Sequence, residues 1–151
     1  RAGVENMTAK RWDATVLDED SVGKADIVIA DLPCSGLGVL GKKTDLKYKM
    51  TEETQRDLAE LQRSILSKVQ AYVKPDGTLL YSTCTIHEAE NMDNVHWFLD
   101  AFPEFELVSI QEELCMELRS SVQEQGCLQF LPGIHESDGF FIAKFKKVKH
   151  G

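Results

Sequence analysis

Two cysteines occupy corresponding places in the sequence, and each could act as a nucleophile. Cys34 lies in residues 31–36 (D-L-P-C-S-G), directly after a short apolar run, and Cys84 lies in residues 82–85 (S-T-C-T) after a second run. Ligands of open α/β sheets bind at the carboxyl ends of the strands, so we expect both thiols and the Asp31 carboxylate on one rim. Because free cysteine is often buried, a structural role is the alternative for either thiol alone. Two such cysteines, one preceded by Asp-x-Pro, favour a functional site.

The elements that must position these residues can be predicted from hydrophobic periodicity. Residues 25–32 are β-branched and apolar, which predicts a buried parallel strand, and residues 77–83 predict a second one. Between them, Thr51 is expected to cap a helix that stops at the turn-forming residues 75–77. The remaining expected elements are a helix over 88–101 and strands over 105–110 and 139–146. This order predicts an α/β fold with a mainly parallel sheet.

The beginning of the chain does not resemble the beginning of a complete nucleotide-binding sheet. Such sheets hold their cofactor at the first strand–loop–helix unit, but here only residues 9–15 form a weak strand pattern and no glycine-rich turn follows them. We therefore expect the first strand and the cofactor loop to be missing. Residues 1–151 are then expected to be the C-terminal portion of one domain, without a second domain.

A glycine motif after the first cysteine offers two other interpretations. Gly36, Gly38 and Gly41 match G-x-G-x-x-G, but three residues separate the motif from the strand, and the charged stretch after it has no apolar helical face. Gly36, Gly41 and Lys42 nearly match a P-loop, but Lys43 stands where a Ser or Thr must hold magnesium. Neither a dinucleotide site nor a P-loop is favoured.

Composition narrows the class of protein further. The chain has 151 residues, 42% of them hydrophobic, and a net charge of −8, which excludes a disordered chain and a globally basic nucleic-acid binder. No apolar run approaches the roughly 18 residues that span a bilayer, and we expect no signal peptide. The four cysteines form no C-x-x-C pair, and the histidines supply no zinc-ligand spacing. We expect a cytoplasmic protein with free thiols, without a metal or a membrane partner.

The two cysteine motifs together resemble those of the RNA cytosine-5 methyltransferases of the Sun family, and within it the bacterial small-subunit ribosomal RNA methyltransferase B type. Further matching positions follow in the family's order: 37–39 (L-G-V), 45–47 (D-L-K), 61–62 (L-Q), 74–81 (K-P-D-G-T-L-L-Y), 90–91 (E-N), 131–133 (L-P-G) and 138–144 (D-G-F-F-I-A-K). Each match alone is short, but the set covers nearly the whole chain.

The resemblance implies a fold and a cofactor. The fold is the Rossmann-like methyltransferase sheet, whose last strands form an antiparallel hairpin, and the cofactor is S-adenosylmethionine. The family's residues at the cofactor correspond to Asp13, Asp31 and Pro33. The chain departs from the family in lacking the first strand, its glycine-rich loop and a nearby lysine.

The resemblance also assigns roles in catalysis. Cys84 corresponds to the nucleophile that adds to C6 of cytosine, which makes C5 reactive toward the methyl group. Cys34 corresponds to the residue that assists product release. Asp31 is expected to bond the N3 and N4 edge of the base, although a strand-terminal Asp can also simply cap a turn.

A short basic segment supports an RNA substrate, for which the resemblance indicates ribosomal RNA. Residues 41–49 carry four lysines against one aspartate in an otherwise acidic chain. Phosphate contacts need only such a local patch, although a solvated loop is the alternative. The lysines are Lys42, Lys43, Lys47 and Lys49.

Two other functional classes stay open at this point. One is a nucleotide-binding or interaction domain without catalysis. The other is a thiol hydrolase, which needs a histidine placed on its nucleophile; His87 is expected to be a polar residue at a helix start instead. Glu90 and Asn91 are expected to cap or brace the helix after Cys84.

Overall fold

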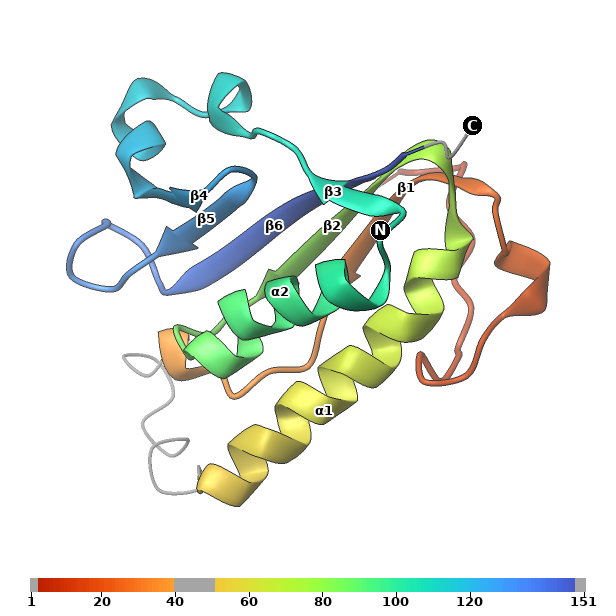
Figure 1. Ribbon diagram of the computed structural model, residues 1–151, viewed down its shortest axis with the longest axis horizontal. Coiled ribbons are helices and arrows are strands. Elements are labelled where there is room, and N and C mark those ends of the chain that lie inside the picture. The colour runs from red at the N-terminus through yellow and green to blue at the C-terminus, as the bar shows by residue number, and fades with distance from the viewer. Residues whose placement is uncertain (1–2, 40–50, 149–151) are drawn as a thin grey trace.

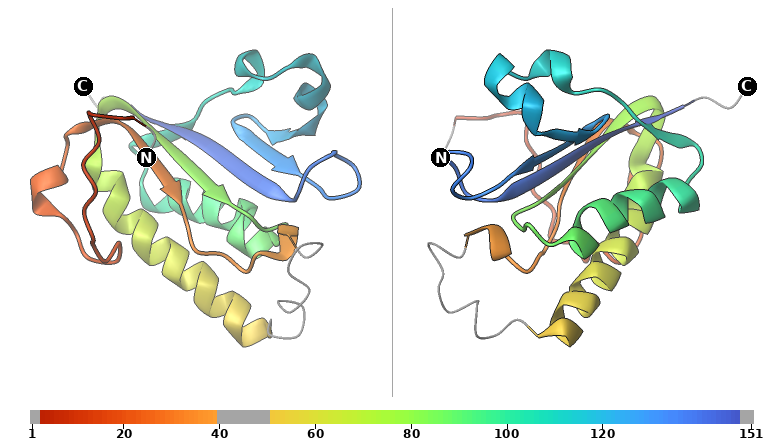
Figure 2. Two further views of the ribbon diagram at one scale, coloured as in Figure 1. Left: turned by 180° about the vertical axis from the view of Figure 1, so that it is seen from behind. Right: turned by 60° about the vertical axis from the view of Figure 1, so that its left-hand side comes forward.

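The chain folds as a mixed sheet with helices packed against one face. The computed structural model describes residues 3–39 and 51–148. Figure 1 shows α1 and α2 on the same side of the sheet, and the views in Figure 2 agree. The helices and strands are α1 (Glu52–Val69), α2 (Met92–Ala101), β1 (Ala25–Asp31), β2 (Val73–Thr83), β3 (Phe105–Leu107), β4 (Val122–Glu124), β5 (Cys127–Phe130) and β6 (Phe140–Lys147). The expected α/β class is confirmed.

The pairing of the strands differs from the expectation. The strand order is β1-β2-β6-β5-β4, and β3 also pairs with β6. Among the named strands of the described residues, β1 and β2 pair in parallel and all other pairs are antiparallel. The expectation of a mainly parallel sheet is therefore wrong for this part of the chain. The physical reason is the chain reversal after β5, which brings β6 back antiparallel beside β2 and agrees with the antiparallel hairpin that the resemblance implies.

Helix α1 forms as its sequence predicts but ends earlier. The Thr51 hydroxyl accepts a hydrogen bond from the Thr54 amide at 3.1 Å, and two acidic residues in the first turn complement the helix dipole. The helix ends at Val69 and is followed by a short 3-10 helix over Gln70–Tyr72. Residues 75–77 do not form a separate turn: they lie inside β2, where the register against β1 shifts and Asp76 has a φ of 62°. Residues 75–77, which were expected to end the helix, therefore form an irregularity within β2.

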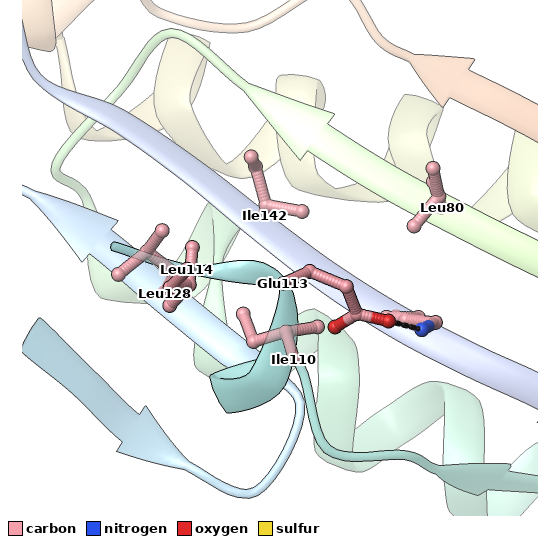
Figure 3. Close-up of a pocket in the computed structure, with 7 residues that line it drawn as sticks. Leu80, Ile110, Glu113, Leu114, Leu128 and Ile142 are labelled. Atoms are coloured by element: carbon pink, nitrogen blue, oxygen red, sulfur yellow. Dashed lines mark hydrogen bonds and ion pairs between the residues drawn. The ribbon is translucent and has the colours of Figure 1, made fainter. Parts of the chain in front are cut away.

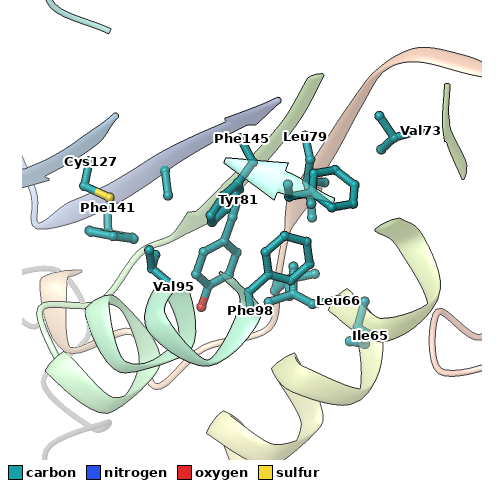
Figure 4. Close-up of a cluster of buried hydrophobic side chains, with 14 residues drawn as sticks. Ile65, Leu66, Val73, Leu79, Tyr81, Val95, Phe98, Cys127, Phe141 and Phe145 are labelled. Atoms are coloured by element: carbon teal, nitrogen blue, oxygen red, sulfur yellow. The ribbon is translucent and has the colours of Figure 1, made fainter. Parts of the chain in front are cut away.

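The core lies between the sheet and the two helices (Figure 4). Phe98 of α2 packs its ring within 5.2 Å, centroid to centroid, of the rings of Phe105 and Phe145. Alternation along β2 points Leu79 and Tyr81 into this core, and both are fully buried. Burial of these large side chains supplies the main driving force that fixes the helices on the sheet.

The opposite face of the sheet is less covered. Ile27 and Ile29 of β1 are 62% and 69% exposed, so the expectation that this strand is fully buried is wrong in this chain. Strand β1 stands at the end of the strand order, and its outward face has no covering layer in the described residues. On the same face, Leu80, Leu128 and Ile142 line a cavity of about 310 Å³ beneath the segment that contains Ile110 and Leu114 (Figure 3).

Several other boundaries were predicted only approximately. Residues 9–15 form no strand, because Asp13 and Thr15 make a turn there. The third expected strand is shorter than 105–110, and the second helix begins with a 3-10 turn over Glu88–Glu90. The segment without a clear pattern, 111–129, contains two 3-10 helices (Gln111–Glu113 and Met116–Ser121) and the hairpin β4–β5.

Two glycines cross at van der Waals contact and tie the loop after Cys34 to the loop before β6. The Gly139 amide donates to the Gly38 carbonyl at 2.8 Å, and the Gly38 amide donates to the Cys84 carbonyl at 3.1 Å. A Cβ at Gly139 would lie 2.6 Å from the Gly38 Cα, which is backbone and cannot rotate away. The crossing therefore requires glycine at both positions.

We expect Gly139→Ala to lower the free energy of unfolding by about 3 kcal/mol, the upper end of overpacking costs, because the two backbones must separate. Gly133→Ala is the matched control: Gly133 has a φ of 81°, but a Cβ at this position would have no heavy atom within 4 Å, so only backbone strain of about 1 kcal/mol is expected. Urea unfolding of the full-length protein, meaning the natural chain that contains these residues, measures both. A Gly133→Ala cost as large as that of Gly139→Ala would contradict the crossing argument.

Candidate active site

The two cysteines lie together at the carboxyl ends of the parallel strands. Asp31, the last residue of β1, is the register partner of Ser82 in β2, and the Leu32 amide donates to the Ser82 carbonyl at 3.1 Å. Cys34 and Cys84 come shortly after these two residues, just beyond the ends of the two strands. The expectation that both thiols share one rim is confirmed.

The sulfur atoms are in direct contact. Cys34 Sγ and Cys84 Sγ are 2.9 Å apart, and the Cys84 amide donates to Cys34 Sγ at 3.2 Å. Both cysteines are free and half-buried, so the pair is reachable from solvent. A structural thiol pair in the core would be fully enclosed, as Cys127 is.

The surroundings of Cys34 keep its thiol protonated. Burial, and secondarily the hydrogen bond with Cys84, raise the pKa of the Cys34 thiol to about 12. Cys34 is therefore protonated at neutral pH and can donate its S–H to Cys84 Sγ. Because the thiolate is the nucleophilic form of cysteine, this protonation disfavours Cys34 as a nucleophile.

Asp31 is held at the rim by the neighbouring strand. Its exposed carboxylate accepts a hydrogen bond from the Ser82 hydroxyl at 2.9 Å, across the parallel pair. This contact is not a turn cap, which was the alternative role for this residue. Pro33 is also exposed, and its carbonyl accepts a hydrogen bond from Gln62 Nε2 at 2.9 Å.

Asp13 makes a local contact instead of reaching the rim. Its Oδ1 accepts hydrogen bonds from the amide and the hydroxyl of Thr15, and the side-chain bond is the main cause that lowers the pKa of Asp13. In the part of the chain that the structure describes, no hydrogen bond joins Asp13 to the residues around the cysteines. The four lysines at 42, 43, 47 and 49 lie outside the described residues.

A buried polar cluster beneath the cysteines was missed by the sequence analysis. Its members are Gln62, Tyr81, Thr83, Thr85, Glu90, Asn91, Asn94 and Gln129, all of them buried. The expectation that Glu90 and Asn91 serve the following helix is wrong: Asn91 stands at the N-cap position of α2 but makes no side-chain cap bond, and both side chains reach toward the cysteine loops. Gln62 could have been found, because its position falls on the apolar face of α1 between Leu58 and Ile65.

His87 lies beside this cluster without contacting a sulfur atom. Its Nδ1 is 3.7 Å from Glu90 Oε1, a distance at which the two form an ion pair only when the histidine is protonated, and neither atom has a hydrogen-bond partner in the described residues. In the described residues no hydrogen bond joins His87 to the sulfur of either cysteine, which disfavours a thiol hydrolase.

Two properties of the described residues bear on other classes of function. No helix there is long and apolar enough to cross a membrane. Those same residues bring together no group of three or more side chains that could bind a metal ion.

Comparison with known proteins gives a consistent family assignment. Residues 1–146 match the sequence profile of a family described as 16S rRNA methyltransferase RsmB/F. The chain is 39% identical to a probable ribosomal RNA small subunit methyltransferase B of Bacillus subtilis, over 95% of this chain and 31% of that protein. It is 31% identical to ribosomal RNA small subunit methyltransferase F of Cronobacter sakazakii, over 98% of this chain and 31% of that protein.

A solved structure has a similar fold. The crystal structure of NSun6 from Pyrococcus horikoshii with SFG superposes with a TM-score of 0.77 at 30% identity, over 98% of this chain and 36% of that one. The chain thus spans about a third of the length of the proteins that it matches. The structural similarity covers nearly the whole of this chain.

The sulfur contact predicts that the pair oxidises readily. We expect hydrogen peroxide to form a Cys34–Cys84 disulfide in the full-length protein: both thiols give up a proton and an electron, and the peroxide is reduced to two water molecules. The sulfurs need to approach by only about 0.9 Å to reach bonding distance. Peptide mapping of the oxidised protein should find these two cysteines linked, and a dithiol should release them. A link through the exposed Cys115 instead, or no link, would contradict the geometry.

Proposed function

The chain belongs to the 16S rRNA methyltransferase RsmB/F family, and on that premise we propose that it takes part in S-adenosylmethionine-dependent methylation of cytosine C5 in RNA. The observation that carries this proposal is the contact between two free thiols, Cys34 and Cys84, at the carboxyl ends of parallel strands. Because the chain spans 31% of its curated relatives, we propose that residues 1–151 form one portion of the catalytic domain.

Cytosine C5 needs activation before it can accept a methyl group. We propose that the Cys84 thiolate adds to C6, which forms an S–C6 bond and moves the electrons of the C5–C6 double bond toward C5. Cys84 suits this step because its partner Cys34 holds its own proton and can donate a hydrogen bond to the attacking sulfur.

Release of the product reverses the addition. The C5 proton leaves to solvent, the C5–C6 double bond forms again, and the S–C6 bond breaks with its electron pair remaining on Cys84. Cys34, protonated and 2.9 Å away, stabilises that departing sulfur. The protonated state of Cys34 and the contact between the sulfurs support this division of roles, which is the one that the resemblance implies.

The remaining rim residues fit the base and the cofactor only in part. Asp31 is exposed and fixed by Ser82, so its carboxylate can bond the edge of the base, and with Pro33 it can border S-adenosylmethionine, which supplies the methyl group. Asp13 is exposed but engaged with Thr15, so its contact with the cofactor remains a proposal from resemblance. Within residues 3–24 the structure contains a 3-10 helix and no strand, so these residues supply no strand–loop–helix unit for a cofactor.

The RNA partner is proposed from charge and family. We propose that Lys42, Lys43, Lys47 and Lys49 contact RNA phosphates, since they form a basic segment between the first cysteine and α1. Ribosomal RNA is the proposed substrate because the matched relatives are named ribosomal RNA methyltransferases. We propose a cytoplasmic location, because the matched relatives are bacterial ribosomal RNA methyltransferases.

The two cysteines should fail in opposite ways when each is removed from the full-length protein. We expect Cys84→Ala to abolish methylation and to form no covalent species, because the nucleophile is gone. We expect Cys34→Ala to retain attack and methyl transfer but to stall at elimination, so that a protein–RNA adduct accumulates. Denaturing electrophoresis after incubation with RNA and cofactor separates the two results.

Two outcomes of this experiment would contradict the proposal. An adduct with Cys84→Ala but not with Cys34→Ala would reverse the roles of the cysteines. Retained methylation in both variants, without an adduct, would exclude covalent catalysis through these thiols and favour a structural role for both. Cys127→Ala is the matched control, because this thiol is fully buried away from the rim.

The isolated 151-residue chain is expected to bind S-adenosylmethionine very weakly or not at all. Backbone amides of a glycine-rich turn at a helix start are the usual contacts to such a cofactor, and the described residues before β1 contain no such unit. Calorimetric titration of the chain tests this, with circular dichroism as a check that the chain is folded. Saturable micromolar binding would place the cofactor site within these residues and overturn the prediction.

A further inference from the structure

Glu90 and Asn91, neighbours in the chain, contact different cysteine loops. Glu90 Oε2 accepts a hydrogen bond from the Ser35 amide at 2.9 Å and another from Gln62 Nε2 at 2.9 Å. Gln62 Nε2 also donates to the Pro33 carbonyl at 2.9 Å. The residues on both sides of Cys34 are therefore held by one carboxylate and the amide bound to it.

Asn91 holds the other cysteine in the same manner. Its Oδ1 accepts a hydrogen bond from the Thr83 hydroxyl at 2.6 Å, and its Nδ2 donates to the Thr85 carbonyl at 3.0 Å. Nδ2 also donates to Gln129 Oε1 at 2.8 Å, which anchors the amide to β5. The residues on both sides of Cys84 are thus held by a single side chain.

The burial of Glu90 shows that this arrangement is costly in free energy. The side chain is fully buried, and its Oε1 has no hydrogen-bond partner in the described residues. Oε1 faces His87 Nδ1 at 3.7 Å, an ion pair only when that histidine is protonated, and burying an acidic side chain with one oxygen lacking a hydrogen bond costs stability. Its main-chain carbonyl is fixed by the Tyr81 hydroxyl, which anchors the pair to the core strand β2.

We propose that Glu90 and Asn91 are positioning residues with separate duties: Glu90, through Ser35 and Gln62, sets Cys34, and Asn91 sets Cys84. This inference rests on the proposed function, since it assigns each residue to one stage of the same reaction. A displacement of about 1 Å in a reacting group can cost about 100-fold in rate. Loss of Glu90 therefore impairs release, and loss of Asn91 impairs attack.

The first arm of the test measures the stage at which each variant of the full-length protein stalls. Glu90→Leu keeps much of the volume but removes both acceptor contacts, and it should accumulate the protein–RNA adduct at least about 10-fold above wild type, as Cys34→Ala does. Asn91→Ala should slow adduct formation and methylation together by about 10- to 100-fold, without accumulation. Glu90→Gln can keep an acceptor oxygen in the place of Oε2, and it should restore the wild-type ratio of adduct to product.

The second arm separates positioning from general destabilisation. In the Cys34→Ala background, Asn91→Ala should slow the build-up of adduct, whereas Glu90→Leu should leave that rate unchanged, because the group it positions is already absent. Val95→Ala is the matched control: Val95 is fully buried in α2, one turn after Asn91, and contacts neither cysteine loop through a hydrogen bond. It should lower stability without changing the ratio of adduct to product.

The outcomes distinguish this inference from the function on which it rests. If Cys34→Ala itself traps no adduct, the proposed covalent reaction fails. If Cys34→Ala traps an adduct but Glu90→Leu and Asn91→Ala stall at the same stage, or at exchanged stages, the division of duties is overturned and the reaction stands. Should Glu90→Leu not fold, Gln62→Leu removes the hydrogen bonds to the Pro33 carbonyl and to Glu90 Oε2, together with those that Gln62 Oε1 accepts, and leaves the bond from the Ser35 amide to Glu90 in place. Adduct accumulation with this variant supports the division, and its absence opposes it.

Discussion

The parallel pairing of β1 with β2 is the contact on which the rest of the site depends. It sets Asp31 beside Ser82, and the two chains then continue side by side to cysteines that are 50 positions apart in the sequence. The side-chain period of a strand is two, so a slip of one residue would turn Asp31 toward the helices and separate the thiols. The apolar core enforces this register, because Leu79 and Tyr81 fill the space under α2 only when they face inward.

The buried side of each helix changes character along its length. In α1 the inward positions run from Gln62 to Ile65 and Leu66, and α2 changes in the same way from Asn94 to Phe98. The polar members of both helices lie beneath the cysteine loops, and the apolar members lie farther from the rim. Such a polar layer is tolerated because nearly every donor and acceptor in it is paired, and a fully paired network is rigid. The core thus stabilises the sheet at one end and orders two loops at the other.

The features that could be predicted from the sequence are those that depend on neighbouring residues in the chain. Strand ends, the Thr51 cap and the amphipathic face of α1 follow from neighbouring residues, and they sufficed to bring Cys34 and Cys84 to one rim. The exposure of Ile27 and the antiparallel return of β6 depend on which strands meet in space, and periodicity does not encode that. The roles of Glu90 and Asn91 were misjudged for a related reason: their positions suit a helix start, but their partners lie in distant loops.

The raised pKa of Cys34 arises from the position of this residue in the framework of strands and helices. Cys34 is enclosed far enough to keep its proton, while its sulfur still accepts the Cys84 amide and contacts the Cys84 thiol. The two cysteine loops are held by the paired strands, by the contact between Gln62 and Glu90, and by the contacts of Asn91, all within the described part of the chain. The contacts that hold the two sulfur atoms together therefore lie within the described residues, on strands and helices that the apolar core fixes in place.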